Sequence, residues 1–331
     1  MAGGQERILR RRIRTVQSTK KITRAMELIA ASRIVKAQAR VAAAVTYAER
    51  ITDVAHHLQS AGGSNHPLLA PRDEIRKVAI IAIGADRGLC GGYNSSITRA
   101  AEAEIREHAA AGRDYTLIAV GRKIEGYFRF RNYKISGVHA GFSASPGYED
   151  ARDIASSVLA PFEAGELDLV QTVYTRFVSA GRQEVVVRPL LPLDSEGFEG
   201  GHTAVAAERA QADHDGPAAA YEFEPNPEAI LGELLPRYAQ ARIYAALLNA
   251  AASEHAARQR AMKAATDNAD ELIRGLSRVM NRARQDAITT EIMEIVGGAE
   301  ALSGGSDDGE AHERFDFGGV RAALTAGHTG N

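Results

Sequence analysis

The two ends of this chain carry long stretches without helix-breaking residues, and these stretches constrain the fold more than any other feature. Residues 5–60 contain neither proline nor glycine. Apolar residues recur there at steps of three and four, the spacing that places side chains along one face of a helix. The repeating positions are Val41, Ala44, Ala48, Ile51, Ala55 and Leu58, and earlier Ile22, Met26 and Ile29. At about 1.5 Å per residue, a helix over this stretch would be roughly 80 Å long.

The C-terminal end repeats this pattern from Pro227 onward. The repeating positions are Ala265, Ala269, Leu272, Leu276, Val279 and Ala283, and Ile288, Ile292 and Ile295 continue the stripe. Proline is tolerated in the first turn of a helix, so Pro227 marks the start, whereas Pro236 should kink or interrupt the first turns. Gly297 and Gly298 predict the end of the helix. Over about seventy residues, this helix would measure on the order of 100 Å.

Neither predicted helix has a partner of comparable length except the other. A chain that leaves along one helix and returns along the other forms an antiparallel coiled coil. The alanine-rich seams would let the two backbones approach closely. The alternative, two helices of one large bundle, requires more helices between them than the middle of the chain supplies.

The middle of the chain alternates strand-like and helix-like stretches. Strands are predicted at 77–83, 115–121, 167–178 and 183–193, and helices at 95–112, 123–131 and 148–164. This alternation predicts a Rossmann-like central domain with a mostly parallel sheet. The expected fold class is therefore α/β, a long antiparallel coiled coil plus this central domain.

The domain boundaries follow from these patterns. The expected parts are an N-terminal coiled-coil helix at 1–60, the central domain at 75–194 and a C-terminal coiled-coil helix at 227–301. Residues 195–226 are interpreted as a mobile segment that leads into the last helix, and 302–331 as a disordered tail, since both are rich in small and polar residues.

Charge is unevenly distributed along the chain. The formal net charge is −2, but residues 1–40 contain eleven Lys and Arg against Glu6 and Glu27. Cys90 is the only cysteine, which excludes an intrachain disulfide and fits a reducing cytosolic setting. No apolar stretch approaches the roughly 20 residues that cross a bilayer. We therefore expect a soluble chain that meets a membrane only through a partner.

The motif GADRGLCGGYN at residues 84–94 leaves a predicted strand and enters a predicted helix. A phosphate-binding P-loop needs a lysine and then Ser or Thr after its final glycine, whereas Gly92 precedes Tyr93. The glycines also lack the spacing of a dinucleotide-binding loop. The ten histidines are scattered and do not form a metal-ligand pattern. We predict a structural corner, with no catalytic residue, no cofactor-binding residue and no metal ligand.

Four blocks of the sequence resemble the γ subunit of F-type ATP synthases nearly word for word. They are ITRAMELIAASRI at 22–34, GADRGLCGGYN at 84–94, AMKAATDNA at 261–269 and ITTEIMEIVGGA at 288–299. The resemblance covers residues 5–301, and the alanine and arginine usage of the first block is similar to that of actinobacterial proteins. The glycine motif then corresponds to the family's strand-to-helix corner.

This resemblance implies a rotor shaft that is not itself an enzyme. In the family, the paired helices thread the hexamer of α and β subunits, where ATP chemistry occurs. The α/β domain lies below and, with the ε subunit, rests on the c-ring at the cytoplasmic face of the cell membrane. Proton-driven rotation of the ring is thereby coupled to ATP synthesis or hydrolysis, and no cofactor of this chain is implied.

The resemblance also implies which residues meet the partners. The positions that match contacts with the β subunits are Lys20, Lys21, Arg24, Met26, Arg33, Arg284 and Gln285. Ile288, Ile292 and Ile295 would form an apolar tip in the bearing at the top of the hexamer. Tyr221 and Glu224 match the segment that touches the c-ring. Exposed ion pairs contribute only about 0–1 kcal/mol each, which suits a reversible sliding contact, although the same charges also fit an ordinary solvated helix face.

Two departures from the family and one rival interpretation complete the sequence analysis. Cys90 alone excludes the thiol switch that a cysteine pair provides in chloroplast members. Bacterial relatives generally end near Leu302, so the last thirty residues are interpreted as a dispensable extension. The rival is a basic coiled coil that binds nucleic acid with an affinity that falls steeply with salt. Against it, the first forty residues contain no aromatic side chain to stack on bases.

Overall fold

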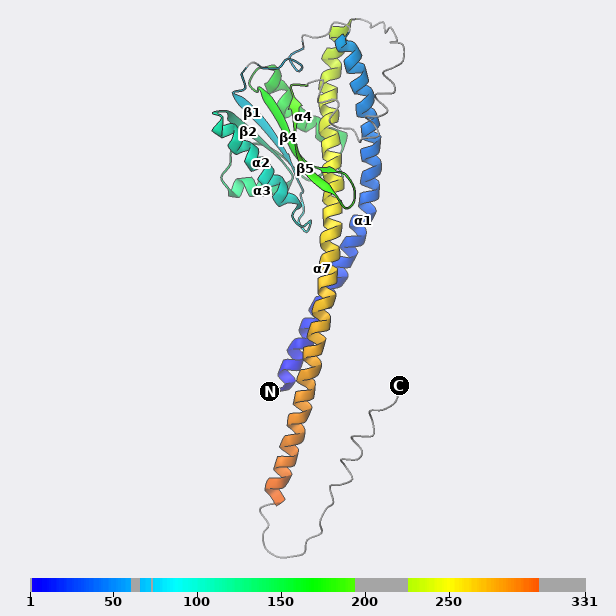
Figure 1. Cartoon of the computed structure of the whole chain (residues 1–331), viewed down its shortest axis with the longest axis vertical. Coiled ribbons are helices and arrows are strands. Elements are labelled where there is room, and N and C mark those ends of the chain that lie inside the picture. Colours follow the sequence, from blue (N-terminus) through cyan, green and yellow to red (C-terminus); the bar gives the residue numbers. More distant parts are fainter. Residues whose placement is uncertain (1, 61–65, 73, 194–225, 304–331) are drawn as a thin grey trace, which may run out of the picture. The chain divides into compact units, whose positions relative to one another are not determined.

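The computed structural model describes residues 2–60, 66–72, 74–193 and 226–303 (Figure 1). The chain divides into two compact units, Met1–Thr15 with Ile273–Asn331, and Val16–Leu272. The helices α1 (Ala2–Ser60) and α7 (Pro227–Ser303) each contribute to both units. The predicted c-ring residues Tyr221 and Glu224, and the tail after Ser303, lie outside the described residues.

The central domain is built on a five-stranded sheet with the strand order β3-β2-β1-β4-β5. The strands are β1 (Lys77–Ile83), β2 (Asp114–Val120), β3 (Ile135–His139), β4 (Leu169–Phe177) and β5 (Gln183–Leu191). Pairing is parallel between β1 and β2, β1 and β4, and β2 and β3, and antiparallel between β4 and β5. The predicted fold class is confirmed. The sequence analysis missed β3, a short strand whose residues alternate between half-buried and exposed.

Helices cover both faces of this sheet (Figure 1). The connecting helices are α2 (Tyr93–Ala110), α3 (Arg122–Phe130) and α4 (Tyr148–Glu163). Side chains of a strand alternate between faces, and the even-numbered residues of β1 from Val78 share a core with α2 and α3. The odd-numbered residues from Ala79 share the opposite core with α4 and with α7 between Leu231 and Ala250. One of the two long helices is therefore a layer of the central domain.

The two long helices pair antiparallel within the unit Val16–Leu272. Lys20 Nζ contacts Asp270, and the hydroxyls of Thr23 and Thr266 lie 2.8 Å apart. Arg40 Nη2 donates to the hydroxyl of Tyr244 at 3.2 Å. The partner numbers fall as the α1 numbers rise, so the predicted antiparallel arrangement is confirmed.

The seam between the helices differs from the predicted one. Between Val16 and Ala44, one row of buried or half-buried positions steps alternately by four and three: Val16, Lys20, Thr23, Glu27, Ala30, Ile34, Ala37, Val41 and Ala44. Met26, Ala31 and Arg40 are half-buried beside this row. Ile22 and Ile29 were predicted in the seam, but they are 59% and 54% exposed. On α7 the predicted Leu272 and Val279 are likewise exposed, and their neighbours Ile273 and Met280 are half-buried instead. A search for apolar residues alone passes over a seam that contains Lys20, Thr23 and Glu27.

The later predicted positions of α1 follow the seam. Ile51 is buried, and Val41 and Ala44 are half-buried. The side chains of Ala48, Ala55 and Leu58 lie outside the part of the chain whose side chains are described.

Neither predicted break interrupts α7. The helix continues through Pro236, where Leu235 and Tyr238 are buried in the core of the central domain and hold the segment in place. It also continues through Gly297 and Gly298 to Ser303. Neither glycine has the positive φ angle that usually ends a helix. None of the described helices contains an apolar run long enough to cross a membrane.

The strand-to-helix corner after β1 lies close against the end of β2. Gly84 N donates to Val120 O at 2.9 Å, and Gly121 has a φ of 97°. A Cβ atom at Gly121 would lie 2.5 Å from the carbonyl oxygen of Gly84, which is a backbone atom and cannot turn away. Both the φ angle and the lack of space require glycine at this position.

We expect Gly121→Ala to lower the free energy of unfolding by about 2–4 kcal/mol, because it combines a strained φ angle with a backbone clash. Gly126→Ala is the matched control, since Gly126 lies inside α3 with no atom within 4 Å of the added Cβ. That variant should be neutral or more stable by about 0.5–1 kcal/mol. Urea unfolding of the full-length chain measures both, and equal effects would contradict this account of the corner.

Candidate functional site

The predicted basic contact residues of α1 fall into two groups. Lys20 contacts Asp270 of α7, and Arg24 Nη1 donates to the Glu27 carboxylate at 2.9 Å. Lys21 and Arg33 are exposed and form no ion pair or hydrogen bond with another described residue. Of these four predicted residues, Lys21 and Arg33 therefore face solvent without a counterion among the described residues. Met26 is half-buried at the edge of the seam.

Four large apolar side chains of α1 face solvent. Ile22, Leu28, Ile29 and Val35 are 59%, 57%, 54% and 65% exposed. At 3.6 residues per turn, Ile22 and Ile29 lie on one flank of α1 and Leu28 and Val35 on another, about 120° apart and both turned away from the seam. We call these four side chains together the α1 apolar stripe. Exposed apolar patches of this kind mark contact surfaces for other molecules. The sequence analysis placed Ile22 and Ile29 in the wrong contact and missed Leu28 and Val35.

The remaining predicted contact residues belong to the other unit, which contains Ile273–Asn331. Arg284 and Gln285 are exposed. The predicted tip residues Ile288, Ile292 and Ile295 are 49%, 55% and 72% exposed. Met293 and Val296, which the sequence analysis did not single out, are also exposed. The end of α7 thus presents an apolar surface of five side chains without a described partner.

A buried ion pair joins α7 to the glycine corner of the central domain. Arg258 Nη2 donates to Glu254 Oε1 at 2.7 Å, and the two side chains are only 10% and 1% exposed. The same Nη2 lies 3.3 Å from Gly88 O and 3.4 Å from Arg87 O. Tyr93 at the start of α2 donates its hydroxyl to Ala250 O at 3.0 Å. The corner is therefore bonded directly to the long helix, a role that its glycine pattern does not indicate.

Asp86 holds the other side of the same corner. Its carboxylate accepts backbone N–H groups of Gly141 at 2.9 Å, Ser143 at 3.0 Å and Arg122 at 3.1 Å. Burial alone would raise the pKa of Asp86, but these donors together hold it below its usual value. The ionised carboxylate thus ties the loops after β1, β2 and β3 together.

We expect Arg258→Met to lower the free energy of unfolding by about 3–5 kcal/mol, because it leaves the buried Glu254 carboxylate without its cation. A Glu254→Met/Arg258→Met double variant should recover part of this loss, since it removes the unpaired charge. Arg129→Met is the control: Arg129 pairs with Glu125 at 2.7 Å but is 70% exposed, so its loss should change stability by at most about 1 kcal/mol. Urea unfolding compares the three variants. A small effect of Arg258→Met would show that the pair does not hold the corner.

Stability should depend on pH through Asp86. Because the folded-state pKa is lowered, the ionised carboxylate stabilises the fold above the unfolded-state pKa, and this contribution is lost as pH falls through the folded-state value. Asp86→Asn should therefore be less stable than the parent chain at neutral pH, with a smaller further loss on acidification. Melting temperatures between about pH 7 and pH 3 test this, with the exposed Asp267→Asn as control. If the melting temperatures of Asp86→Asn and the parent fell equally as the pH was lowered, this role of Asp86 would be contradicted.

Comparisons with known proteins agree on one family. Residues 5–302 match the family model described as ATP synthase. A protein of Frankia casuarinae named ATP synthase gamma chain is 51% identical over 307 residues, which are 92% of this chain and 99% of that protein. A protein of the same name from Kineococcus radiotolerans is 48% identical over 305 residues, 91% of this chain and 97% of that protein.

Solved structures of similar fold come from the same kind of assembly. A chain of the Tetrahymena thermophila mitochondrial ATP synthase central stalk and c-ring is 25% identical, with a TM-score of 0.52 over 74% of this chain and 99% of that one. A chain of the Euglena gracilis mitochondrial ATP synthase is 18% identical, with a TM-score of 0.61 over 95% of this chain and 99% of that one. The second likeness concerns the fold alone.

Proposed function

Since this chain belongs to the ATP synthase gamma chain family, we propose that it is the central rotor shaft of a rotary ATP synthase. It couples proton-driven rotation of a c-ring to ATP synthesis or hydrolysis on a hexamer of α and β subunits. The chain is a non-catalytic member of this machine, and ε is its companion in the rotor. It lies at the cytoplasmic face of the cell membrane and meets the membrane only through the c-ring.

The observation that carries this proposal is the combination of a paired helix with an unpaired apolar stripe. A single helix in water bends and frays, whereas two helices locked along a seam resist twisting. The α1 apolar stripe lies on two flanks of α1 turned away from that seam, so the pair presents apolar surface in more than one direction, as expected of a part that others surround. A shaft inside a ring of subunits meets both requirements.

Contacts with the β subunits follow from the residues that the helix pair leaves available. The α1 apolar stripe supplies apolar area, and Lys21 and Arg33 supply unpaired positive charge. Lys20 can exchange its partner Asp270 for an acidic group of a neighbour at little cost, because both side chains are 37% exposed and exposed ion pairs contribute about 0–1 kcal/mol each. Arg24 is 56% exposed and can meet a neighbour with its remaining N–H groups while it stays paired with the buried Glu27. Met26 lies between these groups.

The end of α7 supplies the remaining proposed contacts. Arg284 and Gln285 catch a loop of a β subunit, and Ile288, Ile292 and Ile295 form the tip in an apolar bearing. Their exposure in the free chain supports this assignment, because large apolar residues at a helix end gain stability when a partner covers them.

Two further proposals concern segments outside the described residues. Tyr221 and Glu224, in the approach to α7, contact the polar loops of the c-ring. Residues 303–331 are a dispensable extension, and a deletion variant assembled into the complex should hydrolyse ATP like the parent.

The alternative, a nucleic-acid-binding coiled coil, has no support from the comparisons. The positive charge of Lys20 and Arg24 is also partly neutralised within the chain. The purified chain should therefore leave DNA unbound at physiological salt.

The proposal is tested by Ile29→Glu in a complex assembled from this chain and its α, β, ε and membrane subunits. A charge forced into an apolar contact costs about 1–3 kcal/mol, so ATP-driven proton pumping should fall by about tenfold. Gln38→Glu, which adds the same charge at an exposed site of α1 outside the stripe, is the control and should pump normally. Both isolated chains should melt like the parent. Normal pumping by Ile29→Glu would reject the stripe as a working contact.

A further inference from the structure

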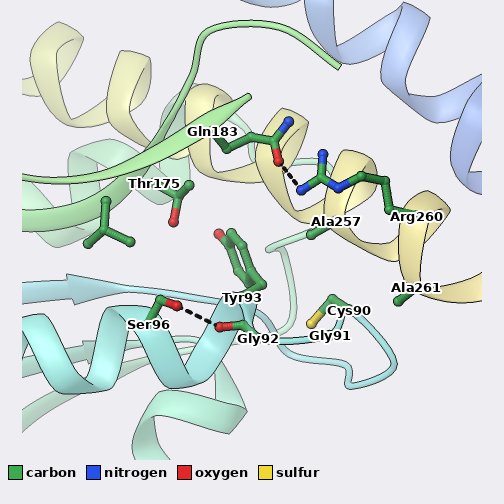
Figure 2. A pocket seen from close by; sticks show the side chains of 11 residues that line it. Cys90, Gly91, Gly92, Tyr93, Ser96, Thr175, Gln183, Ala257, Arg260 and Ala261 are labelled. Atoms are coloured by element: carbon green, nitrogen blue, oxygen red, sulfur yellow. Dashed lines mark hydrogen bonds between the residues drawn. The ribbon is translucent and has the colours of Figure 1, made fainter. Parts of the chain in front are cut away.

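A cavity of about 430 Å³ opens where three parts of the central region meet (Figure 2). The glycine corner and the first turn of α2 form one wall, the β4–β5 hairpin forms another, and α7 forms the third. All of its lining residues belong to the unit Val16–Leu272. The volume falls within the range of pockets that bind small molecules, about 300–1,000 Å³. The rotor proposal gives this cavity no role.

One side chain in the wall has a hydrogen-bonding group without a partner. Thr175 on β4 is 5% exposed, and its Oγ1 forms no hydrogen bond with any described residue. Figure 2 shows this hydroxyl directed from the strand toward Tyr93, into the space that the lining residues enclose. A buried hydroxyl without a partner is destabilising, so the Thr175 hydroxyl points to a ligand that satisfies it.

The cavity wall is positively polarised. Arg260 is the one charged residue of the lining, and the lining contains no carboxylate. Its guanidinium is held in place by Ala180 O at 2.7 Å and by Gln183 Oε1. Of the five N–H donors of an arginine, these two contacts use two and leave three for a ligand.

The N-terminus of α2 adds to this polarity from the opposite wall. Gly92 is the N-cap residue and provides no side-chain cap, and Gly92, Tyr93 and Ser96 all line the cavity. The N–H groups of Tyr93 and Ser96 already donate to Cys90 O and Gly92 O, so it is the dipole of the 18-residue helix that favours a negative charge there. The hydroxyl of Ser96 donates to Gly92 O at 2.9 Å, and its oxygen accepts Nη2 of Arg99 at 3.4 Å.

Cys90 does not give the cavity a reactive thiol. The residue is 2% exposed, and burial raises the pKa of its thiol. Its Sγ accepts Nδ2 of Asn94 at 3.3 Å. The cysteine is therefore a protonated wall residue, and the chemistry of the cavity is binding and not covalent reaction.

We propose that this cavity is a binding site for a small oxyanion, a carboxylate or a phosphate group. Arg260 and the start of α2 supply the charge from two sides, and the Thr175 hydroxyl donates to an oxygen or polar substituent of the ligand. A bound oxyanion bridges the central sheet and α7, and so strengthens the attachment of the domain to the long helix.

Titration calorimetry of the full-length chain with inorganic phosphate and with citrate tests the site at constant ionic strength. Arg260→Gln should weaken binding by about tenfold, because it removes a charge-assisted contact. Thr175→Val should weaken binding roughly fivefold. The unliganded Thr175→Val chain should nevertheless melt at or above the parent temperature, because valine removes a buried hydroxyl that has no partner.

Arg237→Gln provides the matched control, since Arg237 is an exposed arginine of α7 outside the cavity. Its affinity should equal that of the parent. Saturable binding of only one probe supports the site and identifies its ligand class. No saturable binding of either probe, or an equal loss in Arg237→Gln and Arg260→Gln, would overturn the proposal. The isolated chain suffices for this test, so its result is independent of the rotor function.

Discussion

The structure depends on α7 being buried in two places along its length. Between Leu231 and Ala250 the helix is a layer of the central domain, and at Thr266 it pairs with α1. The helix is continuous between these points. Turning the domain about the helix pair would therefore expose the core that they share. The free-energy cost would be about 25 cal/mol for each Å² of apolar surface exposed. A torque applied to the domain passes to the pair through close-packed side chains, with the buried Glu254–Arg258 contact lying between the two segments.

The seam itself is held by small and polar side chains more than by large apolar ones. Thr23 meets Thr266 across it, and Glu27 is buried beside them. Such contacts contribute less stability than leucine or isoleucine would, but polar groups in a seam fix the register of two helices. A shaft that must not slip benefits from a fixed register. The described part of the α/β domain contains no such helix pair, and its cores on both faces of the sheet are mainly apolar.

Sequence patterns predicted the central domain well because its partners lie within the same chain. The strand predicted at 77–83 has the same bounds as β1. Its residues are buried on both faces of the sheet, so they form a continuous apolar run that is easy to recognise in the sequence. The strand β3 was missed because Ile135–His139 lies at the edge of the sheet and is only half-buried. The cavity at Thr175 and Arg260 could not be predicted, because it joins β4 and α7, which are distant in sequence.

The seam prediction was wrong at Ile22 and Ile29 for a different physical reason. Assigning Ile22 and Ile29 to the seam assumed that an apolar residue of a helix contacts another part of its own chain. Helix α1 carries two sets of apolar positions, one of which faces α7 at Ala30 and Ile34 while the other faces solvent. A chain that worked alone would need only the first set, because exposed apolar surface adds no stability to a monomer. The second set therefore indicates a surface of α1 that another protein covers.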